Sequence, residues 1–302
     1  MQAKVVVVGS LNMDLIVRTP RLPVGGETLA GHGFATAPGG KGANQAVAAA
    51  RLGAKVAMIG CVGDDAYGAD LRAGLIAEGI DCSAVMSAYG VPTGIATILV
   101  DDAGQNAIII AAGGNGELTP ERLADHRALL EAADIVIAQL EVPLPTVEAT
   151  LQQAHALGRT VILNPAPATG PLPAHWYGLI DYLIPNESEA ALLTGVPLDS
   201  PQSALLAAQE LLSRGARRVL ITLGSQGVLY ADETRHLHLP VQPVAAVDTT
   251  AAGDTFVGGF AAALATGQSL EAAISLGQQA AALAVTRPGA QPSIPYRHEL
   301  PA

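Results

Sequence analysis

Cysteine, aromatic side chains and charge are all scarce in this sequence. Cys61 and Cys82 are its only cysteines and form no Cys-x-x-Cys motif, which argues against a disulfide framework or a thiolate zinc site. Aromatic residues make up 3% and charged residues 14% of the 302 residues, whereas half of the residues are apolar. This composition excludes a disordered chain and predicts a large core of small aliphatic side chains.

Positive charge and long apolar runs are also lacking. The formal net charge is −11, so neither nucleic acid nor an anionic membrane is expected as a partner. The first apolar run, from Val5 to Val8, ends at Gly9 and is too short for a signal peptide or a membrane span. It is typical of a buried first strand, and a cytoplasmic location is the default expectation.

Short apolar runs alternate with longer helical patterns along the whole chain. Strands are predicted at Lys4–Val8, Val56–Ile59, Ile135–Ala138, Thr160–Leu163, Tyr182–Ile184 and Val219–Thr222. Helices are predicted at Gly42–Arg51, Asp65–Glu78, Pro120–Leu130, Pro145–Leu157, Ser188–Leu193, Pro201–Ser213, Ala251–Ala265 and Ser269–Ala284. Continuous apolar strands separated by helices indicate an α/β fold: a three-layer sandwich with a mostly parallel central sheet. We expect one domain over residues 1–302.

Two segments break this alternation. Residues 11–36 carry a strand pattern followed by many glycines, and residues 93–112 form a hairpin pattern around the turn 101–104. Neither segment fits a strand–helix unit. We therefore expect a small β-sheet that stands off the main sheet and acts as a lid over a site.

Two polar clusters lie near the N-terminus. Residues 38–44 contain three glycines in four positions and lead into an alanine-rich helix, which suits close backbone contact with a polar or anionic group. A plain glycine-rich turn remains the alternative. Asn12 and Asp14 follow the first strand, where open α/β sheets bind ligands. Asp14 could accept hydrogen bonds from sugar hydroxyls, or it could simply cap the strand end.

The most informative stretch runs from Asp248 to Gly259. Small residues at 251–253 open a helix, so their free N–H groups and the helix dipole make a site for a phosphoryl group. Asp254 lies at the same end and could take a proton from an attacking hydroxyl, or it could only stabilise the first helical turn. Gly258 and Gly259 reduce helix stability, so we expect them to allow close packing of this helix on the sheet.

These motifs together resemble the ribokinase-like, or phosphofructokinase-B type, carbohydrate kinases, and the resemblance covers nearly the whole chain. Each motif is moderately specific, and their order and spacing are strongly specific. Residues 39–46, the Ala-Ala-Gly-Asp sequence and the tail 284–293 are similar to the ribose-phosphorylating members. The stretches that carry the resemblance are residues 9–14, 39–44, 164–167, 185–189, 222–227 and 248–259.

The resemblance implies an ATP-dependent kinase that phosphorylates ribose at O5 and uses Mg²⁺ and K⁺, and it implies a homodimer paired through the lid. It assigns the catalytic base to Asp254 and the anion hole to Ala252 and Gly253. It assigns the sugar ligands to Asn12, Asp14, Gly40, Lys41, Gly42, Asn44 and Glu141. It assigns the nucleotide neighbours to Asn186, Thr222, Gly224, Ser225, Gly227 and Gln278.

The same resemblance implies two metal sites. Glu189 is expected to influence Mg²⁺ through water. The potassium site is implied for Asp248, Thr250, Ala284, Arg287, Gly289 and Ser293, several of them through backbone carbonyls. A rigid surface turn is the alternative for this proline-containing loop. His236 and His238 alternate along a probable strand, where an exposed face is a simpler interpretation than a metal pair.

Ribose is the expected acceptor, and 2-deoxyribose, a ketohexose and a nucleoside are the alternatives within the same family. Asp14 and Glu141 suit a small polyhydroxyl ligand, and the shortage of aromatics, with only Phe34 near the lid motifs, argues against stacking a nucleobase. A sugar- or nucleotide-binding regulator without catalysis is the alternative from another class. The intact sequence around Asp254 counts against it.

Overall fold

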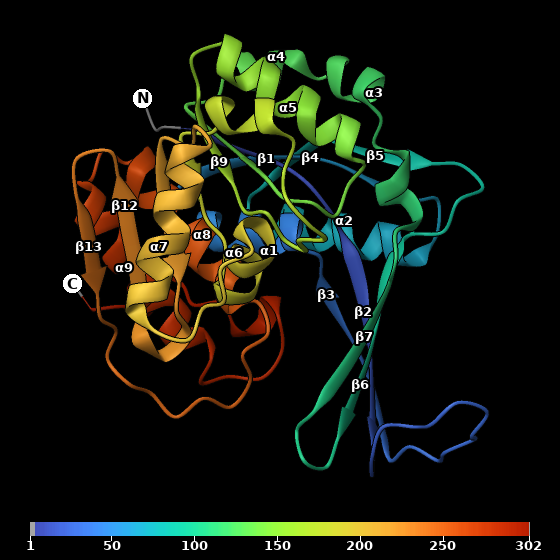
Figure 1. The fold of residues 1–302 in the computed structure, drawn as a ribbon. Coiled ribbons are helices and arrows are strands. Elements are labelled where there is room, and N and C mark those ends of the chain that lie inside the picture. The colour runs from blue at the N-terminus through green and yellow to red at the C-terminus, as the bar shows by residue number, and fades with distance from the viewer. Residues whose placement is uncertain (1–3, 302) are drawn as a thin grey trace.

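The computed structural model describes residues 4–301 and has three layers, with a central sheet between two sets of helices (Figure 1). The strands of this sheet are β1 (Lys4–Val8), β4 (Lys55–Gly63), β5 (Asp81–Ala88), β8 (Ile135–Ala138), β9 (Thr160–Leu163), β10 (Tyr182–Leu183), β11 (Arg218–Thr222), β12 (Val228–Asp232) and β13 (His236–Leu239). Their order is β13-β12-β11-β10-β9-β8-β1-β4-β5. Neighbours from β5 to β11 run parallel, and β12 and β13 are added antiparallel.

Both faces of the sheet are buried, which explains its continuous apolar strands. In β1, Val5 and Val7 pack into one helical layer, whereas Val6 and Val8 pack into the other. The first layer contains α1 (Lys41–Arg51), α2 (Ala66–Ala77), α8 (Ala252–Ala265) and α9 (Leu270–Ala284). The second layer contains α3 (Pro120–Ala124), α4 (Arg127–Glu131), α5 (Leu144–Ala156), α6 (Glu187–Thr194) and α7 (Pro201–Ser213).

Glycines in α8 bring helices together rather than helix and sheet. A Cβ atom at Gly258 would lie 2.6 Å from the carbonyl oxygen of Gln45 in α1, and one at Gly259 would lie 3.1 Å from Cα of Gly277 in α9. The expectation that these glycines pack α8 on the sheet is therefore wrong. Their role is to let α1, α8 and α9 approach one another, and this fixes the start of α8 relative to α1.

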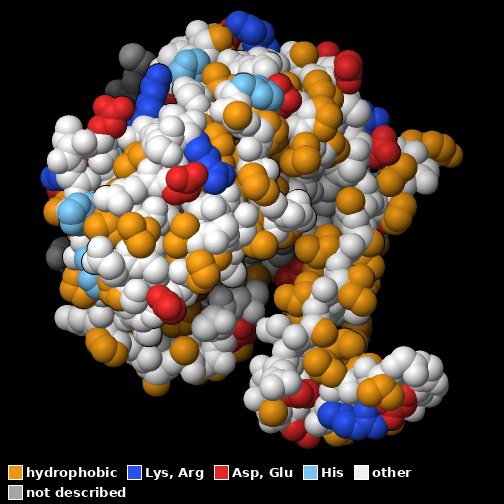
Figure 2. Space-filling view, in the orientation of Figure 1, with side chains coloured by type: hydrophobic (Ala, Val, Ile, Leu, Met, Phe, Trp, Pro, Cys, Tyr) orange, Lys and Arg blue, Asp and Glu red, His pale blue; other side chains and the backbone are white. Residues whose placement is uncertain are grey.

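A second, four-stranded sheet extends away from the body of the molecule (Figure 1). It consists of β2 (Asn12–Thr19), β3 (Gly33–Gly39), β6 (Gly94–Asp101) and β7 (Asn106–Ala111), in the order β3-β2-β6-β7. The outer pairs are antiparallel, and β2 and β6 run parallel. The segments that break the alternation in the sequence thus supply this small sheet. Figure 2 shows many apolar side chains along it.

Several sequence-based boundaries hold to within one or two residues, and others do not. The single helix expected over Pro120–Leu130 is wrong: it is broken at Asp125–His126 into α3 and α4, which bury Leu123 and Leu130 respectively. The strands β5 and β12 were not predicted. No helix within residues 4–301 is long and apolar enough to cross a membrane.

Candidate active site

The predicted site residues gather at the carboxyl edge of the main sheet. The strand order reverses between β1, which ends at Val8, and β8, which ends at Ala138. Such a reversal opens a crevice where the loops after the two strands diverge, and ligands bind there in open α/β sheets. The loop after β1 carries Ser10 and leads to Asn12, and the loop after β8 carries Glu141.

The glycine cluster brings the start of α1 against the loop after β1. Gly40 has φ +90°, a left-handed conformation that favours glycine. A Cβ atom at Gly40 would lie 2.7 Å from the amide nitrogen of Asn12, and one at Gly42 would lie 2.6 Å from that of Ser10. Both positions therefore require glycine for close approach. This contact seats Lys41 and Asn44 beside the loop after β1.

A hydrogen-bonded cluster fixes Glu141 between the two loops. Its Oε2 atom accepts hydrogen bonds from the Ser10 hydroxyl at 2.6 Å and from the Lys41 amide at 3.2 Å. Asp14 lies on β2 with 6% of its surface exposed. Burial raises the pKa of Asp14, and the nearby carboxylates of Glu141 and Asp254 raise it further, to about 7. Burial removes water from the ionised carboxyl, and the two neighbours repel its negative charge.

Lys41 balances part of this negative charge. Burial opposes its charged form, but Asp254, Glu141 and Glu189 outweigh burial and raise the pKa of the ammonium. The group therefore stays protonated at neutral pH. The structure brings the seven expected sugar ligands to one region, in which carboxylates surround a single ammonium.

The first turn of α8 presents the catalytic candidate. Ala251 adopts φ +58° and serves as the N-cap without a side-chain cap, so the next N–H groups have no partner within the helix. The Ala252 amide donates instead to the Thr249 carbonyl just before the helix, at 3.2 Å. Asp254 is buried, with 7% exposure. Its Oδ2 atom accepts a hydrogen bond from Asn44 at 2.9 Å, and its Oδ1 atom accepts one from Gln45 at 2.9 Å.

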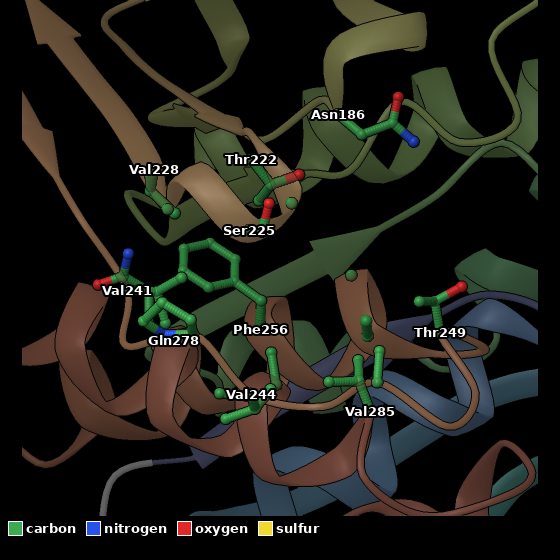
Figure 3. A pocket seen from close by; sticks show the side chains of 18 of the residues that line it. Asn186, Thr222, Ser225, Val228, Val241, Val244, Thr249, Phe256, Gln278 and Val285 are labelled. Atoms are coloured by element: carbon green, nitrogen blue, oxygen red, sulfur yellow. The ribbon is translucent and has the colours of Figure 1, made fainter.

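A cavity of about 550 Å³ opens beside this helix start (Figure 3). Its lining includes all six residues expected near the nucleotide: Asn186, Thr222, Gly224, Ser225, Gly227 and Gln278. Ala252 and Gly253 line it as well. Much of the remaining wall is apolar and includes Val228, Val241 and Phe256, which suits the flat face of a base.

Glu189 lies at the start of α6, close to the cavity. It forms a capping box with Asn186: the Asn186 amide donates to Glu189 Oε2 at 2.9 Å, and the Glu189 amide donates to Asn186 Oδ1 at 2.8 Å. Burial raises the pKa of Glu189, against the opposing effects of the Asn186 hydrogen bond and Lys41. One carboxylate oxygen is thus engaged with the backbone, and Oε1 is left for a water.

Asp248 links the two loops expected to hold potassium. Its Oδ1 atom accepts from the Thr250 amide at 2.9 Å and the Thr250 hydroxyl at 2.6 Å, and its Oδ2 atom accepts from the Gly289 amide at 2.8 Å. Burial opposes the charge of Asp248, but these hydrogen bonds outweigh burial and lower its pKa.

The other potassium candidates have separate partners. The Ala284 carbonyl accepts from the Arg287 amide at 3.0 Å, and the Arg287 side chain pairs with Glu299 at 2.7 Å. Buried Ser293 donates to the Ala290 carbonyl at 2.8 Å. Within the described chain, no three His, Cys, Asp or Glu residues form a metal cluster. The available donors are hydroxyl, carbonyl and carboxylate oxygens, which fit a hard cation rather than a transition metal.

Sequence reasoning missed four buried amides that support the site. Asn115 donates to Asn12 Oδ1 at 2.8 Å and accepts from the Leu11 amide at 2.8 Å, so it orients an expected sugar ligand. Gln45, Gln139 and Asn164 form a second group behind Asp254. Asn164 and Gln45 lie inside stretches that resemble the carbohydrate kinases. That location was the only signal in the sequence that could have identified them.

Comparisons with known proteins agree with this geometry. The sequence matches the pfkB family of carbohydrate kinases over residues 2–297. It is 44% identical to a ribokinase of Haemophilus influenzae, over 99% of this chain and 97% of that protein. It is 38% identical to a deoxyribokinase of Salmonella typhimurium, over 96% and 95%. The structure of Arabidopsis thaliana ribokinase complexed with ribose and ATP aligns with a TM-score of 0.93 and 36% identity, over 99% of this chain and 97% of the other.

The family match spans almost the full chain, the fold agrees with solved ribokinase structures, and the motif residues meet at one edge of the sheet. The chain therefore belongs to the pfkB family of carbohydrate kinases, which makes it an ATP-dependent sugar kinase.

Proposed function

We propose that this protein transfers the γ-phosphoryl group of ATP to O5 of D-ribose, giving D-ribose 5-phosphate and ADP. One observation carries the proposal. Asp254 stands at the boundary between the cluster that contains Asp14 and Glu141 and the cavity lined by Ala252 and Gly253. A sugar hydroxyl and a terminal phosphate bound on the two sides would meet at this carboxylate.

The chemistry follows from this arrangement. Asp254 accepts the proton of the attacking 5-hydroxyl while the oxygen attacks phosphorus in line with the leaving ADP. The N–H groups of Ala252 and Gly253, at the positive end of α8, stabilise the negative charge on the oxygens of the transferred phosphoryl group. Catalysis of this kind is mostly positioning and electrostatics.

On the sugar side, we assign contacts to Asn12, Asp14, Gly40, Lys41, Gly42, Asn44 and Glu141. The acceptor groups of Asp14 and Glu141 and the ammonium of Lys41 suit a small molecule with several hydroxyls. On the nucleotide side, we assign Asn186, Thr222, Gly224, Ser225, Gly227 and Gln278, all of which line the cavity.

We assign Mg²⁺ and K⁺ to the two metal positions. Mg²⁺ neutralises phosphate charge when bound, and Glu189 would hold its water shell, since one of its oxygens already caps α6. The potassium ligands we assign are Asp248, Thr250, Ala284, Arg287, Gly289 and Ser293. Asp248 already joins the two loops, so a cation there would stiffen the start of α8 without touching substrate.

We also assign the small sheet as a lid and as a dimer interface. Within residues 4–301, its outer strands β3 and β7 each have one edge without a partner strand, and Ile108, Ile109 and Phe34 on them are 53%, 70% and 68% exposed. Pairing with a second lid would cover these edges. Closure would exclude water, which competes with the sugar as phosphoryl acceptor. We assign the enzyme to the cytoplasm.

The test is an assay of ADP release with ribose, 2-deoxyribose, fructose and adenosine. We expect the highest kcat/KM with ribose. A preference for 2-deoxyribose is the second candidate, favoured by the 38% identity with a deoxyribokinase, and it would overturn the choice of acceptor. ATP binding without phosphorylation of any acceptor would support a non-catalytic regulator instead.

A further inference from the structure

Three buried amide side chains form a continuous row behind Asp254. Gln139 follows β8, Gln45 lies in α1, and Asn164 follows β9. Their exposed fractions are 0%, 0% and 7%. The row joins the ends of two strands of the central sheet to the first turn of α8, although its members lie far apart in the sequence.

The direction of the hydrogen bonds in this row is fixed by two acceptors, the Ile184 carbonyl and the Asp254 carboxylate. The backbone carbonyl of Ile184 can only accept, so the Asn164 side chain must donate to it with Nδ2, at 2.8 Å. Asn164 Oδ1 is then an acceptor and receives a hydrogen bond from Gln45 Nε2 at 3.0 Å. The second hydrogen of Gln45 Nε2 goes to Asp254 Oδ1 at 2.9 Å.

The other end of Gln45 is also held. Its Oε1 atom accepts from Gln139 Nε2 at 2.6 Å. Rotating the Gln45 amide by half a turn would place its oxygen against the oxygens of Asp254 and Asn164. Because a misdirected buried polar group is costly, Gln45 has one stable orientation, with its donor aimed at Asp254.

The close packing of α1 against α8 fixes the distance between the Gln45 side chain and Asp254. Gly258 lies one turn beyond Asp254, and a Cβ atom there would meet the Gln45 carbonyl oxygen at 2.6 Å. The close approach of α1 and α8 thus depends on the same residue that donates to the carboxylate. Asn44, the neighbour of Gln45, donates to the other oxygen of Asp254 at 2.9 Å. Two consecutive residues of α1 therefore donate hydrogen bonds to the two carboxylate oxygens of Asp254.

We propose that Gln45 is a positioning residue for the phosphoryl transfer, held by Gln139 and Asn164 so that it fixes the carboxylate plane of Asp254. Gln45 is fully buried and offers no surface to a bound sugar or nucleotide, so it would act through Asp254. The inference rests on the proposed role of Asp254 as the base. It gives a function to Asn164, which the sequence marked as part of a motif without assigning it a role.

The first measurement compares Gln45→Met with the unaltered protein. Methionine has a similar length and no donor. We expect kcat to fall about 10- to 100-fold, the range for a misplaced catalytic group, while the KM for ATP changes less than about twofold. Gln153→Met, a half-buried amide on α5 at the opposite face of the sheet, is the matched control and should leave kcat unchanged. An unchanged kcat in Gln45→Met would overturn the proposal.

The decisive measurement repeats the substitution in Asp254→Asn. If Gln45 acts through Asp254, Gln45→Met should reduce the residual rate less than about threefold in that background. An equal loss in both backgrounds would refute the positioning role and leave Asp254 as the base. An Asp254→Asn variant with nearly full activity would instead refute the proposed base.

Gln139→Met covers the case in which Gln45→Met does not fold, because it frees Gln45 Oε1 and leaves the donor to Asp254 in place. We expect kcat to fall about threefold to tenfold, less than for a displaced catalytic group, with an unchanged KM for ATP. If Gln139→Met lowers kcat by the same factor in the Asp254→Asn background, Gln139 does not act through Gln45 and Asp254, and the proposal is refuted.

Discussion

Replacing Asp14 by asparagine should make the sugar-free protein more stable at alkaline pH, even though Asp14 is assigned to the sugar. The folded protein buries this carboxyl beside Glu141 and Asp254, which raises its pKa from 3.8 to about 7. Asparagine has nearly the same shape and no charge to bury. The substitution therefore removes a cost that the unaltered protein carries whenever Asp14 is ionised.

The size of the effect follows from the two pKa values. A raised carboxyl pKa contributes stability below the unfolded value of 3.8, and this contribution is lost as the pH rises to about 7. With about 1.4 kcal/mol for each pKa unit, the loss is about 2 kcal/mol at pH 5 and about 4 kcal/mol at pH 8. The stability advantage of Asp14→Asn should therefore grow by about 2–3 kcal/mol between these pH values.

Urea denaturation at pH 5, 6, 7 and 8 measures this difference. Trp176 is the single tryptophan and is buried, so its fluorescence reports unfolding. Asp248→Asn is the matched control: the pKa of Asp248 is lowered, so its effect on stability should stay constant above pH 5. An Asp14→Asn advantage that is the same at pH 5 and pH 8 would refute the burial argument.

Three further predictions address activity. Asp254→Asn should lower kcat by about 10²–10⁴-fold with ATP affinity unchanged; turnover within about threefold of the unaltered enzyme would exclude Asp254 as the base. Asp14→Ala should raise the KM for ribose and leave nucleotide affinity unchanged, and the reverse pattern would mean that the two sites are assigned the wrong way round. Activity should be low in sodium or lithium buffer and rise with potassium at constant ionic strength, and Asp248→Ala should blunt that response. Equal rates in sodium and potassium would leave residues 287–293 as a rigid surface turn.

The sequence predicted the centre of the sheet better than its margins. The bounds of β1, β8 and β9 match to the residue because each is a continuous apolar run, as burial on both faces requires. The edge strand β5 carries Asp81, Ser83 and Ser87, which dilute the apolar signal on a strand with one neighbour. Close glycine contacts were foreseeable, but their partner helix was not, because a glycine has no side chain to indicate what it faces.

The site shows the same limit. Motifs indicated which residues meet at the sheet edge, and several of them follow a strand end, although the motif at 248–259 follows an irregular segment that begins after β13 ends at Leu239. The amides that orient Asp254 could not be inferred, because Gln45 and Asn164 are separated by 119 residues and a glutamine in an alanine-rich helix has no sequence signature of burial. Their function depends on hydrogen-bond direction, which only the assembled fold defines.

The charges around Asp254 explain why this edge suits a sugar. Asp14, Glu141 and Asp254 are grouped about one ammonium, that of Lys41, so the empty pocket holds more negative charge than it balances. Glu141 and Asp254 already accept hydrogen bonds from the protein, but an apolar ligand would add no donor for the remaining acceptor positions and would be rejected. A ligand with several hydroxyls supplies donors to each carboxylate and stabilises the ionised form of Asp14, which the empty protein disfavours near neutral pH. Sugar binding should therefore release a proton from Asp14 below about pH 7 and release less as the pH rises through that value, and ribose affinity should increase over that range because Asp14 no longer has to lose a proton first.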